Sequence, residues 1–285
     1  MAKCEVCFRH CEIKEGMYGI CHARTVRNGK VVSANYAKVT SIGLDPIEKK
    51  PLNRFFPGSL ILSVGSYGCN LRCPFCQNYD ISWGDNVLND NNDFREISPE
   101  ELVETALRYK PAGNIGIAFT YNEPLVGYEY VRDCAKLAHE NGLKNVLVSN
   151  GTASLKIYDE IAPFIDAMNI DLKSFTKEYY DFIGGDFEMT KAFISEAVKN
   201  CHVELTTLIV PGRNDSEEEM REISSWISGL TDSDGNNVGI NIPLHISRFF
   251  PRFHMQDKNP TDVSLIYRLA DIASEKLRFV YTGNC

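Results

Sequence analysis

The sequence predicts an α/β protein in which a partial (β/α)6 barrel, similar to a TIM barrel, follows a small cysteine-rich N-terminal lobe. From residue 59 onward, short β-branched runs alternate with helical patterns, and each pair takes roughly 35 residues, the rhythm of repeated βα units. No glycine-rich dinucleotide fingerprint accompanies this repeat, which favours a barrel over a doubly wound sheet. Residues 1–58 instead carry four cysteines and five glycines, as expected of an irregular lobe held together by a ligand. We therefore expect two domains, 1–58 and 59–285.

Six strands and their helices follow from the hydrophobic pattern. The strands are expected at 60–64, 115–120, 145–149, 167–171, 203–210 and 238–244. The first helix is expected to begin at Ser98, which Pro99 and Glu101 follow as in a capping box with proline at the first helical position. Later helices are expected at 128–141, 155–161, 190–199, 216–228 and 261–276.

Charge and composition exclude several classes of protein. Lys and Arg number 30 and Asp and Glu number 38, and a net charge of −8 lacks the basic footprint of a nucleic-acid binder. No apolar run approaches the roughly 20 residues that span a bilayer, and the first residues do not resemble a signal peptide, so we expect a cytoplasmic protein without a membrane partner. Seven of the ten cysteines fall in two tight clusters, which indicates metal binding rather than disulfides.

In a barrel of this kind, the residues just after each strand face the active site. Here they are 69–78, 120–124, 149–151, 171–173, 211–215 and 245–248. Most are polar, glycine or able to bind metal. Loops at strand ends are often polar in any barrel, and this ordinary tendency accounts for about half of the pattern.

The loop expected after the first strand carries three cysteines. Cys69, Cys73 and Cys76 have the spacing C-x3-C-x2-C, which allows one compact loop to turn three thiolates toward one centre. A structural zinc site ordinarily needs a fourth protein ligand, whereas a [4Fe–4S] cluster held by three thiolates leaves one iron free for a substrate or cofactor. The sequence nearby offers no fourth ligand. A zinc knuckle is the alternative interpretation.

This cysteine motif, with the aromatic Phe75 before its last cysteine, resembles the signature of radical S-adenosylmethionine (SAM) enzymes. The resemblance implies a partial barrel of the radical SAM type and a [4Fe–4S] cluster on Cys69, Cys73 and Cys76. In that family the open iron binds the amino and carboxylate groups of SAM. Transfer of one electron then releases methionine and a 5′-deoxyadenosyl radical, which abstracts hydrogen from a substrate.

The segment 119–124 lies where radical SAM enzymes carry a motif that meets the SAM amino group. The resemblance implies Thr120, Asn122 and Glu123 as acceptors there. The same residues also suit a capped helix start at Asn122 with Pro124 at the first helical position, an interpretation compatible with the functional one.

Two further segments, 149–151 and 169–173, resemble those of glycyl-radical-enzyme activases such as pyruvate formate-lyase activating enzyme. The resemblance implies that Lys173 reaches the SAM carboxylate and that Asp171 orients Lys173 or holds a cation. A satisfied structural Asp–Lys pair is the alternative. Further cofactor contacts are implied for Asn78, Ser149, Asn150 and His245, the histidine near the SAM ribose. A purely structural histidine is equally expected at position 245.

The activase pattern is not matched throughout. Those activases usually carry an acidic residue and a threonine before the Asn-Gly pair, where this chain has Val148 and Ser149. The amino-group contact and any monovalent cation site at that point are therefore not implied.

The segment 45–52, with 57–59 and 76–78, resembles the radical SAM members of the AmmeMemoRadiSam system, relatives of the pyruvate formate-lyase activating enzymes. The likeness extends from Cys4 to Asn284, although Asn53 and Arg54 stand where a Tyr-His pair is expected. The N-terminal cysteines also fit that pattern: Cys4, Cys7, Cys11 and Cys21. Four thiolates suit structural zinc or a second iron–sulfur cluster, and we favour the structural metal.

The activase likeness implies hydrogen abstraction from a protein or peptide glycine, with a ferredoxin-like or flavodoxin-like reductant. Two segments could contact a macromolecular partner, 83–93 and the aromatic and arginine-bearing 247–255. The second segment is equally expected to be a lid over the barrel mouth. Modification of a small molecule is the alternative enzymatic function, and a zinc-stapled binding protein without catalysis is the alternative from another class.

Overall fold

The computed structural model describes residues 1–91 and 93–285; residue 92, within the expected contact segment 83–93, lies outside the described residues. One eight-stranded sheet organises the chain, in the order β14-β13-β12-β11-β10-β9-β7-β6. Its strands are β6 (Ser41–Pro46), β7 (Leu60–Gly65), β9 (Asn114–Phe119), β10 (Lys144–Ser149), β11 (Ala167–Asp171), β12 (His202–Ile209), β13 (Leu244–Arg248) and β14 (Val280–Gly283). Neighbours run parallel except β6, which pairs antiparallel with β7. The predicted α/β class with a partial barrel is confirmed.

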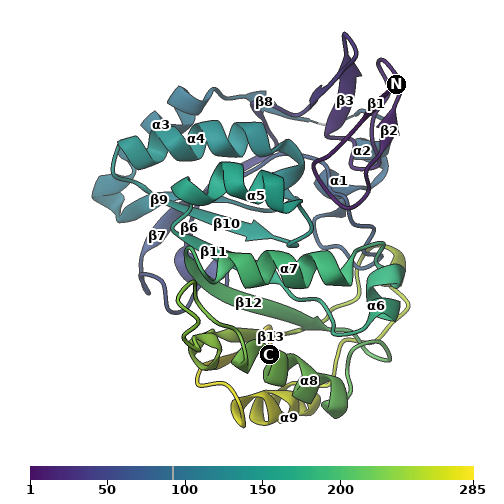
Figure 1. Ribbon diagram of the computed structural model, residues 1–285, viewed down its shortest axis with the longest axis vertical. Coiled ribbons are helices and arrows are strands. Elements are labelled where there is room, and N and C mark those ends of the chain that lie inside the picture. The colour runs from purple at the N-terminus through teal and green to yellow at the C-terminus, as the bar shows by residue number, and fades with distance from the viewer. Residues whose placement is uncertain (92) are drawn as a thin grey trace.

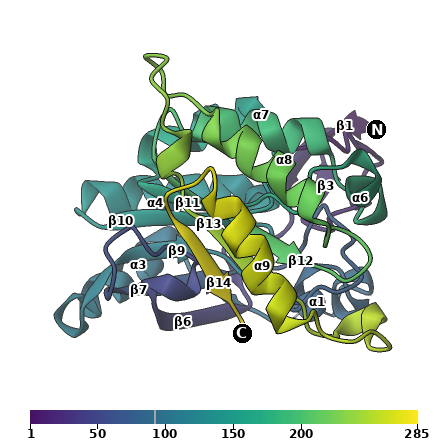
Figure 2. The ribbon, with the colours of Figure 1, turned by 90° about the horizontal axis from the view of Figure 1, so that it is seen from below.

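The main helices alternate with the parallel strands and pack around the outside of the curved sheet (Figures 1 and 2). They are α3 (Pro99–Arg108), α4 (Tyr128–Glu140), α5 (Leu155–Ile161), α6 (Lys177–Phe182), α7 (Phe187–Ala197), α8 (Glu217–Ser228) and α9 (Val263–Ser274). Two short helices, α1 (Tyr79–Ser82) and α2 (Asp85–Leu88), follow the cysteine loop. Helix α3 begins with the predicted capping box, because Ser98 and Glu101 each accept a hydrogen bond from the other's backbone N–H. The large apolar core lies between these helices and the sheet.

The last predicted strand, 238–244, is wrong. Residues Gly239–Asn241 form a 3-10 helix, η5, and the strand begins only at Leu244. A Cβ on Gly239 would lie 2.0 Å from the carbonyl oxygen of Ile227, so this apolar stretch packs tightly against the end of α8. Packing against a helix end produced the apolar pattern that suggested a strand.

The structure also contains elements that the sequence did not predict. Strand β6 comes from residues assigned to the lobe, yet it forms one edge of the main sheet, and β14 forms the other edge. Helix α6 follows β11 and precedes α7. Between β6 and β7, the 3-10 helix η1 (Ile47–Lys49) leads a segment whose Ile47 and Leu52 are fully buried with inner residues of the sheet.

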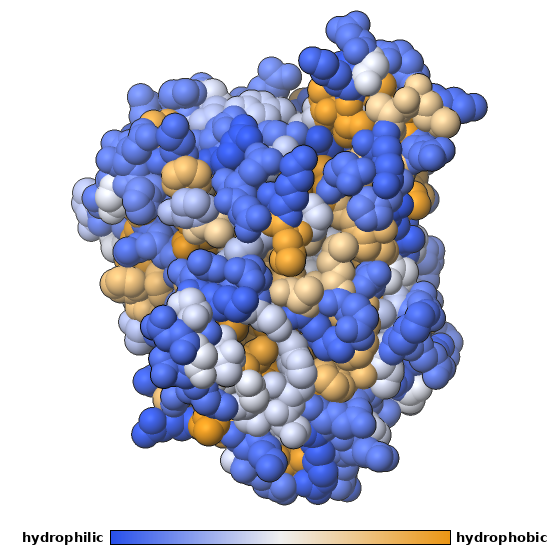
Figure 3. All heavy atoms as spheres, in the orientation of Figure 1, coloured by the Kyte–Doolittle hydropathy of each residue, from blue (hydrophilic) through white to orange (hydrophobic). Residues whose placement is uncertain are grey.

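The N-terminal lobe contains short two-stranded pieces. Strand β1 (Ala2–Lys3) pairs with β2 (Glu12–Ile13), and β3 (Arg24–Arg27) pairs with β4 (Lys30–Ser33). Strand β5 (Lys38–Val39) pairs with β8 (Arg95–Glu96), which comes from a later part of the chain. Of these strands, β1, β2 and β3 lie at the upper right of Figure 1. Figure 3 shows apolar side chains on the surface of this lobe, where Met17, Tyr18 and Ile20 are exposed. Within the part of the chain that the structure describes, no helix combines the length and apolar character needed to cross a membrane.

Candidate functional site

A cavity of about 630 Å³ opens at the carboxyl ends of the parallel strands. The sheet and the segment before β7 both contribute to its wall, so residues far apart in sequence meet there. The predicted site residues that line it are Cys69, Cys73, Phe75, Cys76, Asn78, Thr120, Asn122, Glu123, Ser149, Asn150, Asp171, Lys173 and His245. The four N-terminal cysteines lie elsewhere, around a second and much smaller cavity.

The three thiols of the cysteine loop all face this larger cavity. The Sγ of Cys69 accepts hydrogen bonds from the backbone N–H of Leu71 at 3.4 Å and from the Asn150 amide at 3.8 Å. The indole N–H of Trp83 donates to the carbonyl oxygen of Cys73 at 3.2 Å. Burial raises the pKa of all three thiols, that of Cys73 to about 12, so they stay protonated until a metal binds. Three thiols that line one cavity, with N–H donors on one sulfur, suit an iron–sulfur cluster, in which each thiolate binds a different iron.

Aromatic side chains cover the cysteine loop. The Phe75 ring is buried edge-to-face on Phe249, with centroids 6.1 Å apart. The Phe253 ring stacks on Tyr79 at 4.4 Å and meets Trp83 at 4.8 Å. Segment 247–255 thus packs on the cysteine loop through Phe249 and Phe253, whereas Phe250 of the same segment is 39% exposed.

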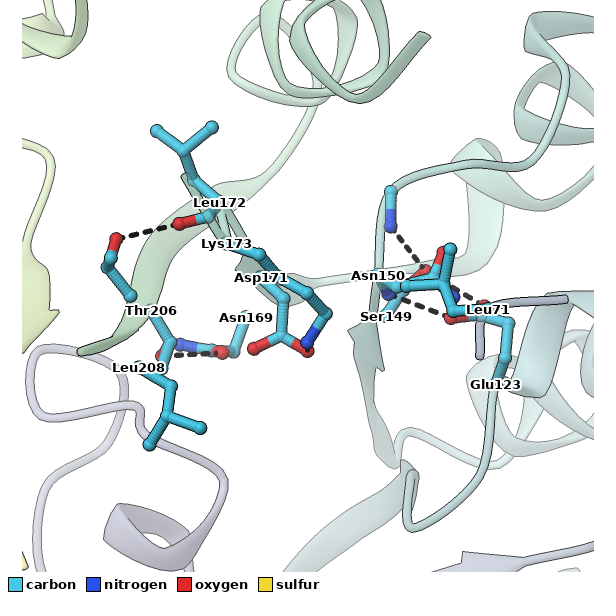
Figure 4. Close-up of polar contacts among 12 residues, drawn as sticks. Leu71, Glu123, Ser149, Asn150, Asn169, Asp171, Leu172, Lys173, Thr206 and Leu208 are labelled. Atoms are coloured by element: carbon cyan, nitrogen blue, oxygen red, sulfur yellow. Dashed lines mark hydrogen bonds and ion pairs between the residues drawn. The ribbon is translucent and has the colours of Figure 1, made fainter. Parts of the chain in front are cut away.

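Glu123 is a buried carboxylate on the wall of the cavity, where it caps the short 3-10 helix η3 (Pro124–Gly127). It accepts hydrogen bonds from the backbone N–H of Asn150 at 2.7 Å and of Leu125 at 3.0 Å, and from the Ser149 hydroxyl at 2.9 Å (Figure 4). Burial outweighs these bonds and raises its pKa to about 7. A carboxylate in this state gains from a cationic ligand that enters the cavity.

Asn122 and Thr120 precede Glu123 in the sequence and differ in their contacts. The Asn122 side chain accepts a hydrogen bond from the backbone N–H of Ser66 at 3.1 Å and donates to the carbonyl oxygen of Gly68 at 3.0 Å. Its polar atoms therefore hold the start of the cysteine loop. Thr120 is 6% exposed at the carboxyl end of β9 and lines the cavity.

Asp171 and Lys173 form an ion pair at the end of β11. Their oxygen and nitrogen lie 2.9 Å apart, and the Lys173 side chain is 16% exposed (Figure 4). Burial disfavours the ammonium, but Asp171 and the nearby Cys73 together raise the pKa of Lys173. Asn214 holds this strand end in place because its amide donates to the Lys173 carbonyl oxygen at 2.7 Å.

Glu204, the buried acid behind His245, is a site residue that the sequence did not predict. Its side chain is 0% exposed, and His245 Nε2 lies 2.7 Å from its Oε2. The His245 ring stacks on Tyr281 with centroids 5.2 Å apart, and both rings line the cavity. An acidic residue inside an apolar strand, at Val203-Glu204-Leu205, was the signal that could have found it.

The group of polar side chains around Tyr121 was also not predicted from the sequence. The Tyr121 hydroxyl donates to Asp45 at 2.9 Å, and the buried Lys50 ammonium lies 2.9 Å from the same carboxylate. Tyr121 has a positive φ of 75°, and a Cβ on Gly65 would lie 2.8 Å from its ring. Only glycine fits opposite this left-handed tyrosine, which shapes the loop before Glu123.

The N-terminal thiols Cys4, Cys7, Cys11 and Cys21 surround an enclosed cavity of about 10 Å³. Burial raises the pKa of Cys4 and Cys7 and raises that of Cys21 to about 12. Arg24 lines the same cavity, is 4% exposed and has no hydrogen-bond partner for Nε in the described chain. Across residues 1–91 and 93–285, no three His, Cys, Asp or Glu side chains are grouped as ligands of one metal ion.

Comparison with known proteins connects this site to a family. The model of the radical SAM superfamily matches residues 63–227. An uncharacterized protein of Methanocaldococcus jannaschii is 37% identical over 295 residues, which cover 99% of this chain and 81% of that protein. The pyruvate formate-lyase-activating enzyme of Clostridium pasteurianum is 30% identical over 168 residues, 57% of this chain and 67% of that enzyme.

Solved structures show the same fold. SuiB of Streptococcus suis aligns over 78% of this chain and 48% of its own, with a TM-score of 0.57 at 13% identity. A domain of pyruvate-formate lyase-activating enzyme from Bacteroides vulgatus aligns over 59% of this chain and 99% of its own, with a TM-score of 0.50 at 15% identity.

Proposed function

This chain belongs to the radical SAM superfamily and is an enzyme, and we propose that it cleaves SAM reductively at a [4Fe–4S] cluster held by Cys69, Cys73 and Cys76. The observation that carries the proposal is that these thiols, Glu123 and Lys173 line one cavity. When bound, the cluster supplies the single electron that cleaves the carbon–sulfur bond of SAM. Hydrogen abstraction from a second substrate follows.

The chain's own groups divide the binding of SAM between two walls of the cavity. Glu123 accepts the SAM ammonium, and this opposite charge favours the ionised carboxylate that burial alone disfavours. Lys173 binds the SAM carboxylate, and Asp171, 2.9 Å away, keeps the ammonium group of Lys173 oriented. Asn150 holds the Cys69 sulfur, while Thr120 and Ser149 supply hydroxyls beside Glu123.

The test is anaerobic reconstitution with iron and sulfide, reduction with dithionite in the presence of SAM, and chromatography for 5′-deoxyadenosine. Wild type is expected to form deoxyadenosine, and Cys69→Ser is expected to lose both the cluster and the product. Cys201→Ser removes a cysteine outside both clusters and serves as the matched control. A wild-type protein that binds only zinc and leaves SAM intact contradicts the proposal.

We place the chain in the AmmeMemoRadiSam branch and in the cytoplasm, with a ferredoxin-like or flavodoxin-like electron donor. Support for the branch comes from the segment 45–52 and the N-terminal cysteines. The electron donor is tested in the deoxyadenosine assay, with reduced ferredoxin or flavodoxin in place of dithionite. An enzyme that forms deoxyadenosine with dithionite but with neither protein contradicts this part of the proposal.

For the second substrate we propose a protein or peptide, in line with the match to pyruvate formate-lyase-activating enzymes. The cavity of about 630 Å³, which Ser247 helps to line, favours a second candidate, a small molecule bound within it. Incubation with deuterated protein or with deuterated metabolites distinguishes the two. Deuterium in deoxyadenosine from the protein fraction alone supports the first, and deuterium from the metabolites alone supports the second.

We also propose that Cys4, Cys7, Cys11 and Cys21 hold a structural metal in the lobe, as zinc or as a second iron–sulfur cluster. Arg24 beside these thiols offsets the charge of the thiolates that metal binding creates. Metal analysis of Cys7→Ser is expected to show loss of this metal with retention of the Cys69 cluster. Equal metal content in wild type and variant contradicts the site.

A further inference from the structure

Residues 47–54, which begin with η1 and lead toward β7, pack against inner residues of the curved sheet. We call this segment the strap. Glu48, Lys49, Pro51 and Asn53 of the strap line the large cavity. The strap therefore forms part of the wall that a ligand meets in this half of the cavity.

Inward-facing polar residues fasten the strap at three points. Lys50 pairs with Asp45 at 2.9 Å. The Asn169 amide donates to the Pro51 carbonyl oxygen at 2.9 Å, and Thr206 holds Asn169 in turn (Figure 4). The third point is Glu204, which lies 150 and 151 residues after the two strap residues that it binds.

Glu204 binds the strap and two histidines with the same carboxylate. Its Oε1 accepts from the backbone N–H of Arg54 at 2.7 Å and lies 2.9 Å from His202 Nε2. Its Oε2 accepts from the backbone N–H of Asn53 at 3.0 Å and lies 2.7 Å from His245 Nε2. Four donors thus satisfy a fully buried carboxylate.

This arrangement fixes the orientation of His245. An ionised carboxylate can only accept hydrogen bonds, so His245 must present Nε2–H to it, which leaves Nδ1 to meet a ligand. Stacking on Tyr281 prevents the ring from turning freely. The hydroxyls of Thr206, Ser247 and Tyr281 belong to the same part of the cavity.

We propose that Glu204 is a positioning residue that holds His245 and the strap in one arrangement, and so shapes the half of the cavity that takes a hydroxyl-bearing part of the bound ligand. The proposal rests on the proposed function, because SAM is the ligand used to test it. Glu204 acts through His245 and the strap and does not line the cavity itself.

The first measurement is hydrogen exchange of the backbone amides of Asn53 and Arg54, compared between Glu204→Gln and His202→Gln in the reconstituted enzyme. Glu204→Gln is expected to speed exchange at both amides at least tenfold, since the neutral amide accepts fewer hydrogen bonds. His202→Gln removes one donor from the same carboxylate and is expected to change exchange less than threefold. Equal exchange at both amides in wild type and Glu204→Gln overturns the proposal.

The second measurement is a double-mutant cycle on deoxyadenosine formation with Glu204→Gln, His245→Ala and the pair. We expect each single variant to raise the KM for SAM about tenfold with a smaller change in kcat, and the pair to match His245→Ala within twofold. Effects that multiply in the pair describe two independent structural losses and overturn the positioning role. A wild type that forms no deoxyadenosine refutes the proposed function instead. The exchange measurement alone then tests whether Glu204 holds the strap.

Discussion

Glu123 and Glu204 are both buried carboxylates in the same barrel, yet their environments drive their pKa values in opposite directions. Burial raises the pKa of Glu123 to about 7 in spite of three hydrogen bonds. Burial also acts against the charge of Glu204, but His202, His245 and two backbone N–H groups lower its pKa to about 2. The difference lies in their partners, since Glu123 has no basic side chain among its hydrogen-bond donors.

The contrast indicates that Glu123 serves to bind a ligand and that Glu204 serves to hold the structure. Glu123 lines the cavity, so a cationic ligand can supply the charge that its environment lacks. Glu204 lies behind the wall, and its partners come from the chain itself. A buried carboxylate without a basic partner thus indicates a binding role. A buried carboxylate whose partners all come from the chain indicates a positioning role.

Removal of the charge of Glu123 should give the largest functional effect. Glu123→Gln is expected to weaken SAM binding at least a hundredfold, because the SAM ammonium loses its buried partner. The thermal midpoint should also fall, because three donors then share one acceptor oxygen. This fall should be smaller than for Glu204→Gln, since burial already disfavours the Glu123 anion. Equilibrium binding of SAM to reconstituted enzyme measures the effect, and an affinity within threefold of wild type contradicts the assignment of Glu123.

Removal of the charge of Glu204 should give the largest effect on stability. Glu204→Gln is expected to cost on the order of 2–4 kcal/mol, because four donors then share one acceptor oxygen and face a new N–H group. Denaturant unfolding under anaerobic conditions measures the cost. If Glu123→Gln proves more destabilising than Glu204→Gln, the contrast between the two acids is reversed.

The pH dependence of stability sharpens the contrast further. The folded pKa of Glu123, about 7, exceeds its usual value of 4.5, so the folded chain binds more protons than the unfolded chain between these values. Its contribution to stability therefore falls as the pH rises from about 5 to 7, by at most about 1.4 kcal/mol per unit. The pKa of Glu204 is low, so its contribution is constant above about pH 5.5 and is lost only as the pH falls from 4.5 toward 2.

Unfolding midpoints of wild type and the two variants between pH 5 and pH 8 check this expectation. The difference between wild type and Glu123→Gln should change across the window. The difference between wild type and Glu204→Gln should stay constant above about pH 5.5. The reverse behaviour would show that the two environments have been assigned to the wrong residues.

The smallest effect is expected at His202. Its side chain is 30% exposed and supplies one of the four donors to Glu204. His202→Gln should lower stability by under about 1 kcal/mol and leave the KM for SAM unchanged, because His245 keeps its own bond. A rise in KM as large as that of His245→Ala would show that the whole carboxylate network, rather than its cavity side, sets the binding of SAM.

Hydrophobic periodicity and capping residues predicted much of this fold. The prediction failed where contacts between residues far apart in sequence determine the secondary structure. The expected helix at 155–161 has the observed bounds, and the capping box at Ser98 is present as predicted. The stretch around Gly239 looked like a strand because packing on α8 requires the same apolar side chains. Strand β6 was missed because its antiparallel pairing with β7 has no counterpart in a regular βα repeat.

The candidate site was predictable where a motif lies on one loop. Cys69, Cys73 and Cys76 are such a case, and Glu123 and Lys173 follow from short segments at strand ends. Glu204 could not be found this way, because its partners include residues that precede it by about 150 positions and one that follows it by 41. Asp45 and Tyr121, 76 positions apart, escaped for the same reason.

The lobe is held by residues far along the chain, and this limits when it can fold onto the barrel. Arg9 donates to the carbonyl oxygens of Asn70 and of Gly184, the latter 175 positions away. The backbone of Cys7 forms an isolated antiparallel β-bridge with that of Ala153. Arg9 is synthesised before Gly184, so its contact with Gly184 forms only after the chain beyond residue 184 has emerged. Long loops must close before these contacts form, which slows folding. We expect the lobe to reach its final place later than the parts of the barrel that it contacts.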